Sequence, residues 1–124
     1  MQPYFDGEVL KEKETQYPKV WDCFGTTSSA KDEIKELFGD RKAFSTPKPV
    51  KLMKELIRAT TNKNSIIMDF FAGSGTVGQA CIELNKEDGG NRKYILVSNN
   101  ESNICKEITY KRISKLDSKV KFID

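Results

Sequence analysis

One stretch, SIIMDFFAGSGTVGQA at residues 65–80, constrains the fold of this chain more than any other. Its first part is short, continuously apolar and ends in Asp69, which is typical of a buried strand. Glycines follow, and apolar residues then recur at helical spacing over residues 76–86. The apolar positions of this predicted helix are Val77, Ala80, Cys81 and Leu84. A strand, a glycine turn and a helix in this order form the first half of a β-α-β unit.

Two helices are predicted before this stretch. The first covers residues 29–39, with Ser29 as its N-cap and Gly39 at its end. The second begins at Pro47, a residue suited to the first helical position, behind a capping Thr46. Its residues at helical spacing are Leu52, Met53, Leu56, Ile57 and Thr60.

Further elements are predicted after the glycine turn. Residues 93–98, KYILVS, have the pattern of a second buried strand, and residues 103–116 that of a helix. The inward positions of this helix are Ile104, Cys105, Ile108 and Ile113. Residues 119–124, KVKFID, fit a third strand. Strands that alternate with helices predict an α/β fold with a parallel sheet and right-handed crossovers.

Composition excludes several kinds of chemistry. Histidine is absent, so Ser-His, Cys-His and His-metal sites within this chain are excluded, and we expect no metal. Cys23, Cys81 and Cys105 lack CxxC spacing, which argues against a disulfide framework and a zinc site. The net charge of +3 is too small to indicate a nucleic-acid partner. No apolar run approaches the ~20 residues that span a bilayer, and no signal peptide is recognisable, so we expect a cytoplasmic protein without a membrane partner.

The glycines fit more than one ligand. Gly73, Gly75 and Gly78 match G-x-G-x-x-G, and Glu101 follows Gly78 by 23 residues, near the position of the ribose-binding acid in dinucleotide folds. A Walker A loop is excluded because no lysine follows the glycines. Spacing alone therefore leaves a dinucleotide as one candidate.

The position of Asp69 favours a different ligand, S-adenosylmethionine. Three residues separate Asp69 from Gly73, and a carboxylate beside a pyrophosphate would be repulsive. S-adenosylmethionine instead carries a sulfonium and an ammonium against one carboxylate, which suits an acid at the turn. Glycines allow the backbone to approach the ligand closely, and Glu101 can accept hydrogen bonds from both ribose hydroxyls.

Each of these residues also has a structural explanation. Asp69 can be a turn acid, Glu101 a solvated loop acid and Lys48 a solvated side chain. Of Phe70 and Phe71, one is expected in the core, because neighbours on a strand point to opposite faces. We favour a functional role because two strands end in acid-bearing loops at one sheet edge, where ligands of open α/β sheets bind.

Three motifs resemble those of amino-methylating DNA methyltransferases and occur in that family's order. DFFAGSGT resembles the S-adenosylmethionine motif D-x-F-x-G-S-G-T, and FSTPKPVKLMKELI is similar to the segment that precedes it. NRKYILVSNNESNICKEITYKRI is similar to the following strand-acid-helix segment in methyltransferases of type III restriction-modification systems. These motifs cover about residues 44–116, and residues 17–39 are similar to a stretch upstream of them in that subgroup.

The resemblance implies a partial Rossmann-like methyltransferase fold that binds S-adenosylmethionine through residues 44–124. Residues 1–43 would be the end of a recognition region or a linker. Thr46 and Lys48 would contact the methionine end of the cofactor, and Glu101 the ribose. The full set of implied cofactor-binding residues is Thr46, Lys48, Asp69, Phe70, Phe71, Ala72, Gly73, Ser74, Gly75, Thr76 and Glu101.

The resemblance also implies site-specific methylation of adenine N6 in DNA. The family's catalytic motif, [DNS]-P-P-[YFW], is missing because the sequence has no Pro-Pro pair, so no catalytic residue is expected in this chain. The chain would then be the C-terminal portion of the enzyme. Its partners would be the missing N-terminal methyltransferase portion, double-stranded DNA, a restriction subunit or a second copy of itself. The alternatives are a dinucleotide-binding oxidoreductase fragment and a non-catalytic remnant or assembly module.

Overall fold

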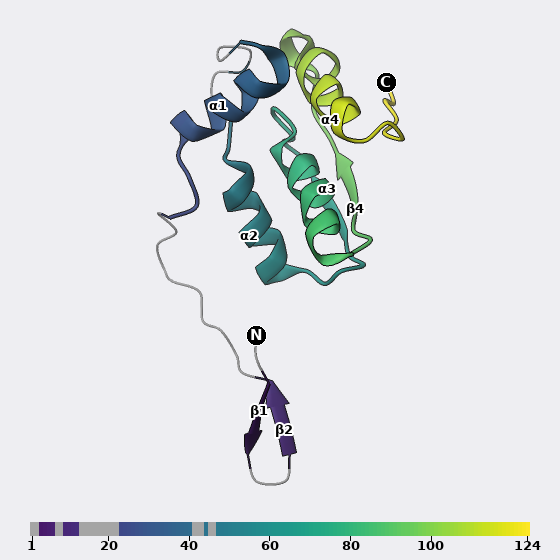
Figure 1. Ribbon diagram of the computed structural model, residues 1–124. Helices are drawn as coiled ribbons and strands as arrows, with labels where there is room; N and C mark the ends of the chain where they lie inside the picture. The colour runs from purple at the N-terminus through teal and green to yellow at the C-terminus, as the bar shows by residue number, and fades with distance from the viewer. Residues whose placement is uncertain (1–2, 7–8, 13–22, 41–43, 45–46) are drawn as a thin grey trace.

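The computed structural model describes residues 3–6, 9–12, 23–40, 44 and 47–124 (Figure 1). Its strands are β1 (Pro3–Asp6), β2 (Val9–Glu12), β3 (Ile66–Asp69) and β4 (Lys93–Leu96). Its α-helices are α1 (Thr27–Phe38), α2 (Val50–Thr60), α3 (Thr76–Asp88) and α4 (Lys111–Leu116). A 3₁₀ turn, η1 (Glu101–Asn103), and a π-helix, η2 (Cys105–Tyr110), precede α4. Strands β1 and β2 pair antiparallel as a hairpin.

Strands β3 and β4 pair in parallel, with Ile66 opposite Lys93 and Asp69 opposite Leu96. Helix α3 makes the crossover that a parallel pair requires. The predicted alternation of strand and helix around the glycine turn is therefore confirmed, and the chain contains an α/β unit with a two-stranded parallel sheet. Helices α2 and α3 lie side by side next to this sheet (Figure 1).

The core lies between these helices and one face of the sheet. Its buried members are Val50, Ile57, Ala80, Cys81 and Leu84. Ile67 and Tyr94, from the centres of the two strands, pack against it. Burial raises the pKa of the Cys81 thiol to about 11, so the thiol stays neutral and behaves as a small apolar side chain.

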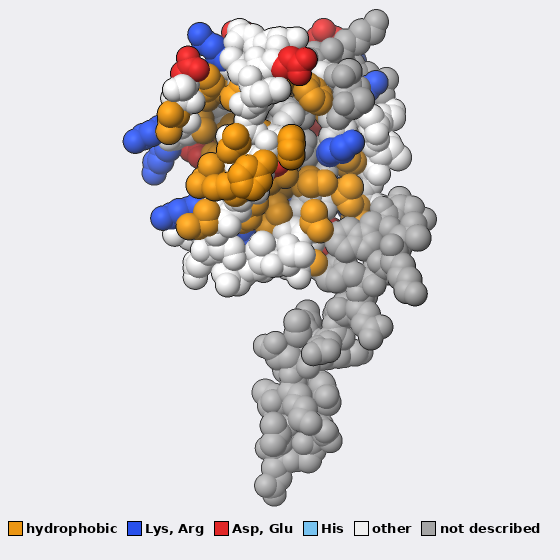
Figure 2. All heavy atoms as spheres, turned by 180° about the vertical axis from the view of Figure 1, so that it is seen from behind, with side chains coloured by type: hydrophobic (Ala, Val, Ile, Leu, Met, Phe, Trp, Pro, Cys, Tyr) orange, Lys and Arg blue, Asp and Glu red, His pale blue; other side chains and the backbone are white. Residues whose placement is uncertain are grey.

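The opposite face of the sheet is exposed, so the prediction of two buried strands is wrong for that face. Ile66, Met68, Ile95 and Val97 are all more than two-fifths exposed. Figure 2 views the molecule from behind and shows hydrophobic side chains gathered in the middle of this surface. Their apolar character reflects a parallel sheet that is normally covered on both faces. Among the described residues, only one layer of helices covers it.

Helix α1 begins two residues earlier than predicted. Thr26 is its N-cap, with Oγ1 accepting from Ser29 N at 3.1 Å, and Ser29 Oγ accepts from Thr26 N at 2.8 Å. Ser29 therefore completes a capping box and is not the N-cap itself. Gly39 ends the helix in a left-handed conformation, as predicted.

Helix α2 begins later than predicted, at Val50 and not at Pro47. Pro49 keeps the preceding Lys48 out of the helical region, because the proline ring clashes with a helical neighbour. The first N–H of the helix is satisfied from elsewhere: both carboxylate oxygens of Glu33 accept from Val50 N, at 3.1 and 3.4 Å. The predicted cap, Thr46, lies outside the described residues.

The segment after β4 differs most from prediction. One helix was predicted over residues 103–116, but η1, η2 and α4 follow each other there. Ile113 is buried as predicted, whereas Ile104, Cys105 and Ile108 are only half-buried. Residues 119–124 form no strand; the Phe122 ring lies 5.6 Å from the Tyr110 ring and keeps this segment beside η2. No helix in the described part of the chain is long and apolar enough to cross a membrane.

Candidate functional site

The carboxyl ends of β3 and β4 are joined by hydrogen bonds beyond the strands. Val97 N donates to Asp69 O at 2.8 Å, and Ala72 N donates to Val97 O at 3.1 Å. The turn after β3 and the loop after β4 therefore meet at one sheet edge, which is the arrangement that the sequence predicted.

The glycine turn leads into the N-terminus of α3. Gly73 and Gly75 both have positive φ, at +52° and +86°, and Gly75 N donates to Ala72 O at 2.8 Å. Gly75 is also the N-cap of α3 and supplies no side chain to its first N–H groups. These N–H groups carry the positive end of the helix dipole, which favours an electron-rich group beside the turn.

Gly75 and Gly78 are also too closely packed for a residue with a Cβ atom. A Cβ on Gly75 would lie 3.2 Å from Thr109 Cγ2. A Cβ on Gly78 would lie 2.8 Å from both Ile113 Cδ1 and Leu96 Cδ1. The glycines thus bring α3 close to α4 and β4, in addition to shaping the turn.

The two predicted acids occupy different environments. Asp69 is half-buried at the end of β3, and its Oδ1 accepts from Phe71 N at 3.0 Å, so it shapes the turn. Glu101 is exposed in η1, and its backbone N donates to Asn99 Oδ1 at 3.1 Å. Both lie in the loops that follow the two strands, one after each.

The side chains of Ser74 and Thr76 are buried and turned into the protein. Their hydroxyl oxygens are 3.3 Å apart, and Thr76 Oγ1 donates to Lys48 O at 3.0 Å. The Lys48 side chain is exposed. The hydroxyl groups therefore hold the turn from inside, and of residues 73–76 only Gly73 is partly exposed.

The remaining predicted cofactor-binding residues differ in how deeply they are buried. Ala72 is buried, and Thr46 lies outside the described residues. Phe70 is 64% exposed and Phe71 is 92% exposed, so the expectation that one of them is in the core is wrong. Strand β3 ends at Asp69, and the two phenylalanines therefore belong to the turn, where strand alternation does not apply.

Two residues of the turn's surroundings were missed by sequence reasoning. Thr109 Oγ1 donates to Gly73 O at 2.6 Å. Arg112 is completely buried, and its Nη1 donates to Ser74 Oγ at 2.9 Å. Burial lowers the pKa of Arg112 to about 10, so the guanidinium remains charged at neutral pH. Their spacing from Cys105 and Ile108 places them near the same helical face, which was the available signal.

The loop after β4 contains three residues other than glycine in the left-handed backbone conformation. Asn100, Ser102 and Asn103 all have positive φ, between +52° and +61°. The Asn100 side chain holds this loop, since its Oδ1 accepts from Lys106 N at 3.3 Å. Such conformations cost energy in residues other than glycine and cluster at functional sites, which fits the loop that carries Glu101.

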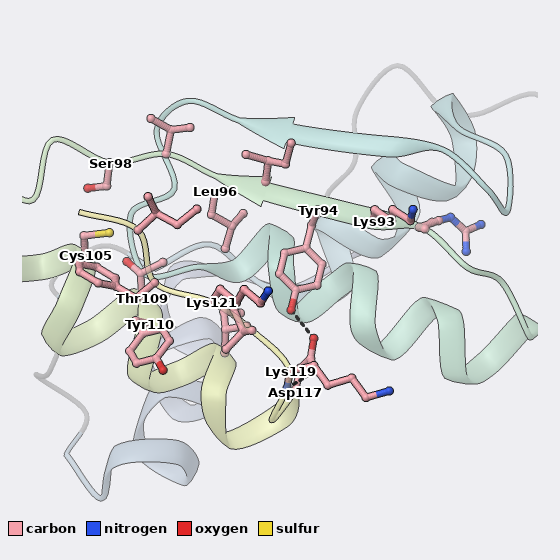
Figure 3. Close-up of a pocket in the computed structure, with 17 residues that line it drawn as sticks. Lys93, Tyr94, Leu96, Ser98, Cys105, Thr109, Tyr110, Asp117, Lys119 and Lys121 are labelled. Atoms are coloured by element: carbon pink, nitrogen blue, oxygen red, sulfur yellow. Dashed lines mark hydrogen bonds between the residues drawn. The ribbon is translucent and has the colours of Figure 1, made fainter.

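A cavity of about 640 Å³ runs along β4, between the strand and the C-terminal segment (Figure 3). The Tyr94 hydroxyl donates to Asp117 Oδ2 at 2.6 Å across it. Ser98, Cys105 and Thr109 lie toward one end (Figure 3), and none of the predicted cofactor-binding residues that the structure describes lines this cavity. Among the described residues, no cluster of acidic residues and cysteines could hold a metal ion.

Comparison with known proteins places these features in context. A family model described as "DNA methylase" matches residues 2–112. The chain is 40% identical over 113 residues to the StyLTI Mod subunit, a type III restriction-modification enzyme of Salmonella typhimurium, and the match covers 82% of this chain. It is 42% identical to the EcoPI Mod subunit of Escherichia phage P1, over 75% of this chain. It is 41% identical to the type II methyltransferase M.KpnI of Klebsiella pneumoniae, over 68% of this chain. The matches span only 17%, 15% and 20% of these relatives, respectively.

Proposed function

The chain belongs to the DNA methylase family, and from that premise we propose that it is the S-adenosylmethionine-binding portion of an adenine N6 DNA methyltransferase. The supporting observation is the joint position of Asp69, the glycine turn and the uncapped start of α3. Together they offer a carboxylate to a cationic cofactor and backbone N–H groups to its oxygen atoms. Residues 44–124 would form this portion of a Rossmann-like sheet.

The residues of this chain would bind and orient the cofactor. When bound, S-adenosylmethionine would supply a sulfonium methyl group for transfer to the exocyclic amine of adenine. Asp69 would face the cationic part of the methionine, and Glu101 would accept hydrogen bonds from the ribose. Rate enhancement in such a transfer depends on holding amine and methyl in line, with the base extruded from the duplex. The chain has no Pro-Pro motif to hold the base.

The remainder of the methyltransferase would supply that base pocket. The relatives are about five to seven times longer than the matched segments, which leaves ample polypeptide for this role. We expect it to cover the exposed outer face of the sheet, where Ile66, Met68, Ile95 and Val97 lie. Residues 1–43 would lead from the recognition region into the cofactor portion. Double-stranded DNA is the proposed substrate, and a restriction subunit a proposed partner, since two of the relatives are Mod subunits.

Calorimetric titration of the full chain with S-adenosylhomocysteine tests the proposal. We expect saturable binding and no comparable response to NAD, whereas the reverse result would support a dinucleotide-binding fragment. The substitution Asp69→Asn keeps the acceptor for Phe71 N but removes the charge. It should weaken binding of S-adenosylmethionine about 10-fold, the size expected for a hydrogen bond to a charged group.

The matched control is Asp88→Asn, which removes a carboxylate at the other end of α3. Binding should change less than about twofold, because Asp88 pairs with Arg92 and is distant in sequence from the turn. Equal weakening by both substitutions would contradict a role for Asp69 in the site. The isolated chain should transfer no methyl group to DNA.

A further inference from the structure

Arg112, on α4, is a buried cation directly beneath the glycine turn. Its side chain has no exposed surface, although arginine is rarely buried without a close carboxylate. Among the described residues its one ion-pair partner is Glu33, with 3.9 Å between Nη2 and Oε2. This separation is too long for a hydrogen bond, and Nη2 has no other partner in the described part of the chain.

Most hydrogen bonds of this guanidinium go to the turn. Nη1 donates to Ser74 Oγ at 2.9 Å, to Ser74 O at 3.3 Å and to Thr76 Oγ1 at 3.2 Å. Nε donates to Gln79 Oε1, on the first turns of α3, at 2.7 Å. The guanidinium is planar, so these acceptors are fixed in relation to one another. Arg112 thus holds the turn and the start of α3 from the interior of the protein.

The same bonds reach the segment before α2. Thr76 Oγ1 accepts from Arg112 and also donates to Lys48 O. Glu33, which lies near the guanidinium, accepts from Val50 N. Two of the three segments that carry the predicted cofactor-binding residues, the glycine turn and the segment before α2, therefore meet at this buried group.

We propose that Arg112 is the positioning residue of the cofactor site: by fixing Ser74 and Thr76 it holds the glycine turn and the start of α3 in the one arrangement that binds S-adenosylmethionine. This inference rests on the proposed function. Arg112 does not touch the cofactor in this role. It acts through hydroxyl groups that face the interior, so the turn presents its backbone to the ligand in one arrangement.

Arg92 provides a matched comparison. It is also buried, and it lies beyond the other end of α3. Its guanidinium donates to Asp88 at 2.9 and 3.1 Å, within its own local segment. If a buried arginine matters only for general stability, replacing either one should affect ligand binding through unfolding alone.

The test compares Arg112→Met, Arg112→Lys and Arg92→Met in the full chain. Calorimetry would measure the Kd of S-adenosylhomocysteine at a temperature well below each variant's Tm. Arg112→Met should weaken binding by about 10-fold or more, since small misplacements of a binding group are costly. Arg112→Lys should give an intermediate Kd, because lysine keeps the charge but cannot reach all four acceptor atoms. Arg92→Met should bind within about twofold of the unmodified chain.

Amide hydrogen exchange without ligand gives a second readout. Arg112→Met should speed exchange at Gly75 N, which donates within the turn, while amides of β3 and β4 keep their protection. Unchanged ligand affinity in a folded Arg112→Met or Arg112→Lys variant would overturn the inference. A lack of binding by the unmodified chain would instead contradict the proposed function. Exchange at Gly75 N would then still decide whether Arg112 fixes the turn.

Discussion

The two ends of helix α3 have the same components in different arrangements. Each end has a left-handed glycine, Gly75 with φ +86° and Gly89 with φ +67°. Each also has a buried arginine nearby, Arg112 at the start and Arg92 beyond the end. Arg92 is paired with the carboxylate of Asp88, whereas Arg112 bonds mainly to uncharged oxygen atoms.

The sequence distances of these contacts explain the difference. At the C-terminal end, Arg92 contacts Asp88 and Asn85, which are four and seven residues away. The C-terminal end of α3 is therefore closed by contacts between residues that are near one another in the sequence. At the N-terminal end, Arg112 contacts Ser74, which is 38 residues away, and the first N–H groups of α3 have no side-chain cap. An end that is assembled from distant segments, yet leaves helix donors uncapped, is suited to a ligand.

The largest expected difference in stability is between alanine substitutions at the two left-handed glycines, Gly75 and Gly89. Gly75→Ala should lower the free energy of unfolding by ~3 kcal/mol or more, because strained φ adds to the contact with Thr109. Gly89→Ala should cost only about 1 kcal/mol, since a Cβ there meets nothing within 4 Å. Urea unfolding of the two variants measures this difference. Equal losses of unfolding free energy in the two variants would show that the two ends of α3 do not differ in packing.

A smaller effect concerns the response to acid. The pKa of Asp88 is held below its usual 3.8, first by the hydrogen bond from Arg92, so its contribution to stability is lost as pH falls through the folded pKa. Burial raises the pKa of Glu33 above 4.5, although Val50 N and Arg112 oppose the shift. Glu33 therefore contributes stability below pH 4.5 that is lost as pH rises through its folded pKa.

Carbon-detected NMR titration of the two carboxyl groups checks these signs. Asp88 should titrate below 3.8 and Glu33 above 4.5. In Arg92→Met, the Asp88 midpoint should move up toward 3.8, while that of Glu33 stays in place. A shift of Glu33 in that variant would mean that the two ends are electrostatically coupled.

The strand, the glycine turn and α3 could be predicted because glycine spacing and apolar periodicity are local signals. The cap of α2 could not, because its first N–H is satisfied by Glu33, which lies 17 residues upstream. The buried roles of Thr109 and Arg112 were missed because both side chains are polar, and apolar periodicity selects only apolar residues as buried. Exposure of Ile66 and Met68 could not be predicted either, since apolar residues do not reveal which element covers them.

In the proposed function, the N-terminal end of α3 binds the cofactor and the C-terminal end does not. Amide NMR of the labelled chain during titration with S-adenosylhomocysteine tests it most directly. We predict saturable shifts at residues 69–76 and at Glu101, with the amides of residues 86–92 unchanged. Shifts confined to residues 86–92, or to the residues that line the cavity along β4, would show that the cofactor does not bind at the N-terminal end of α3.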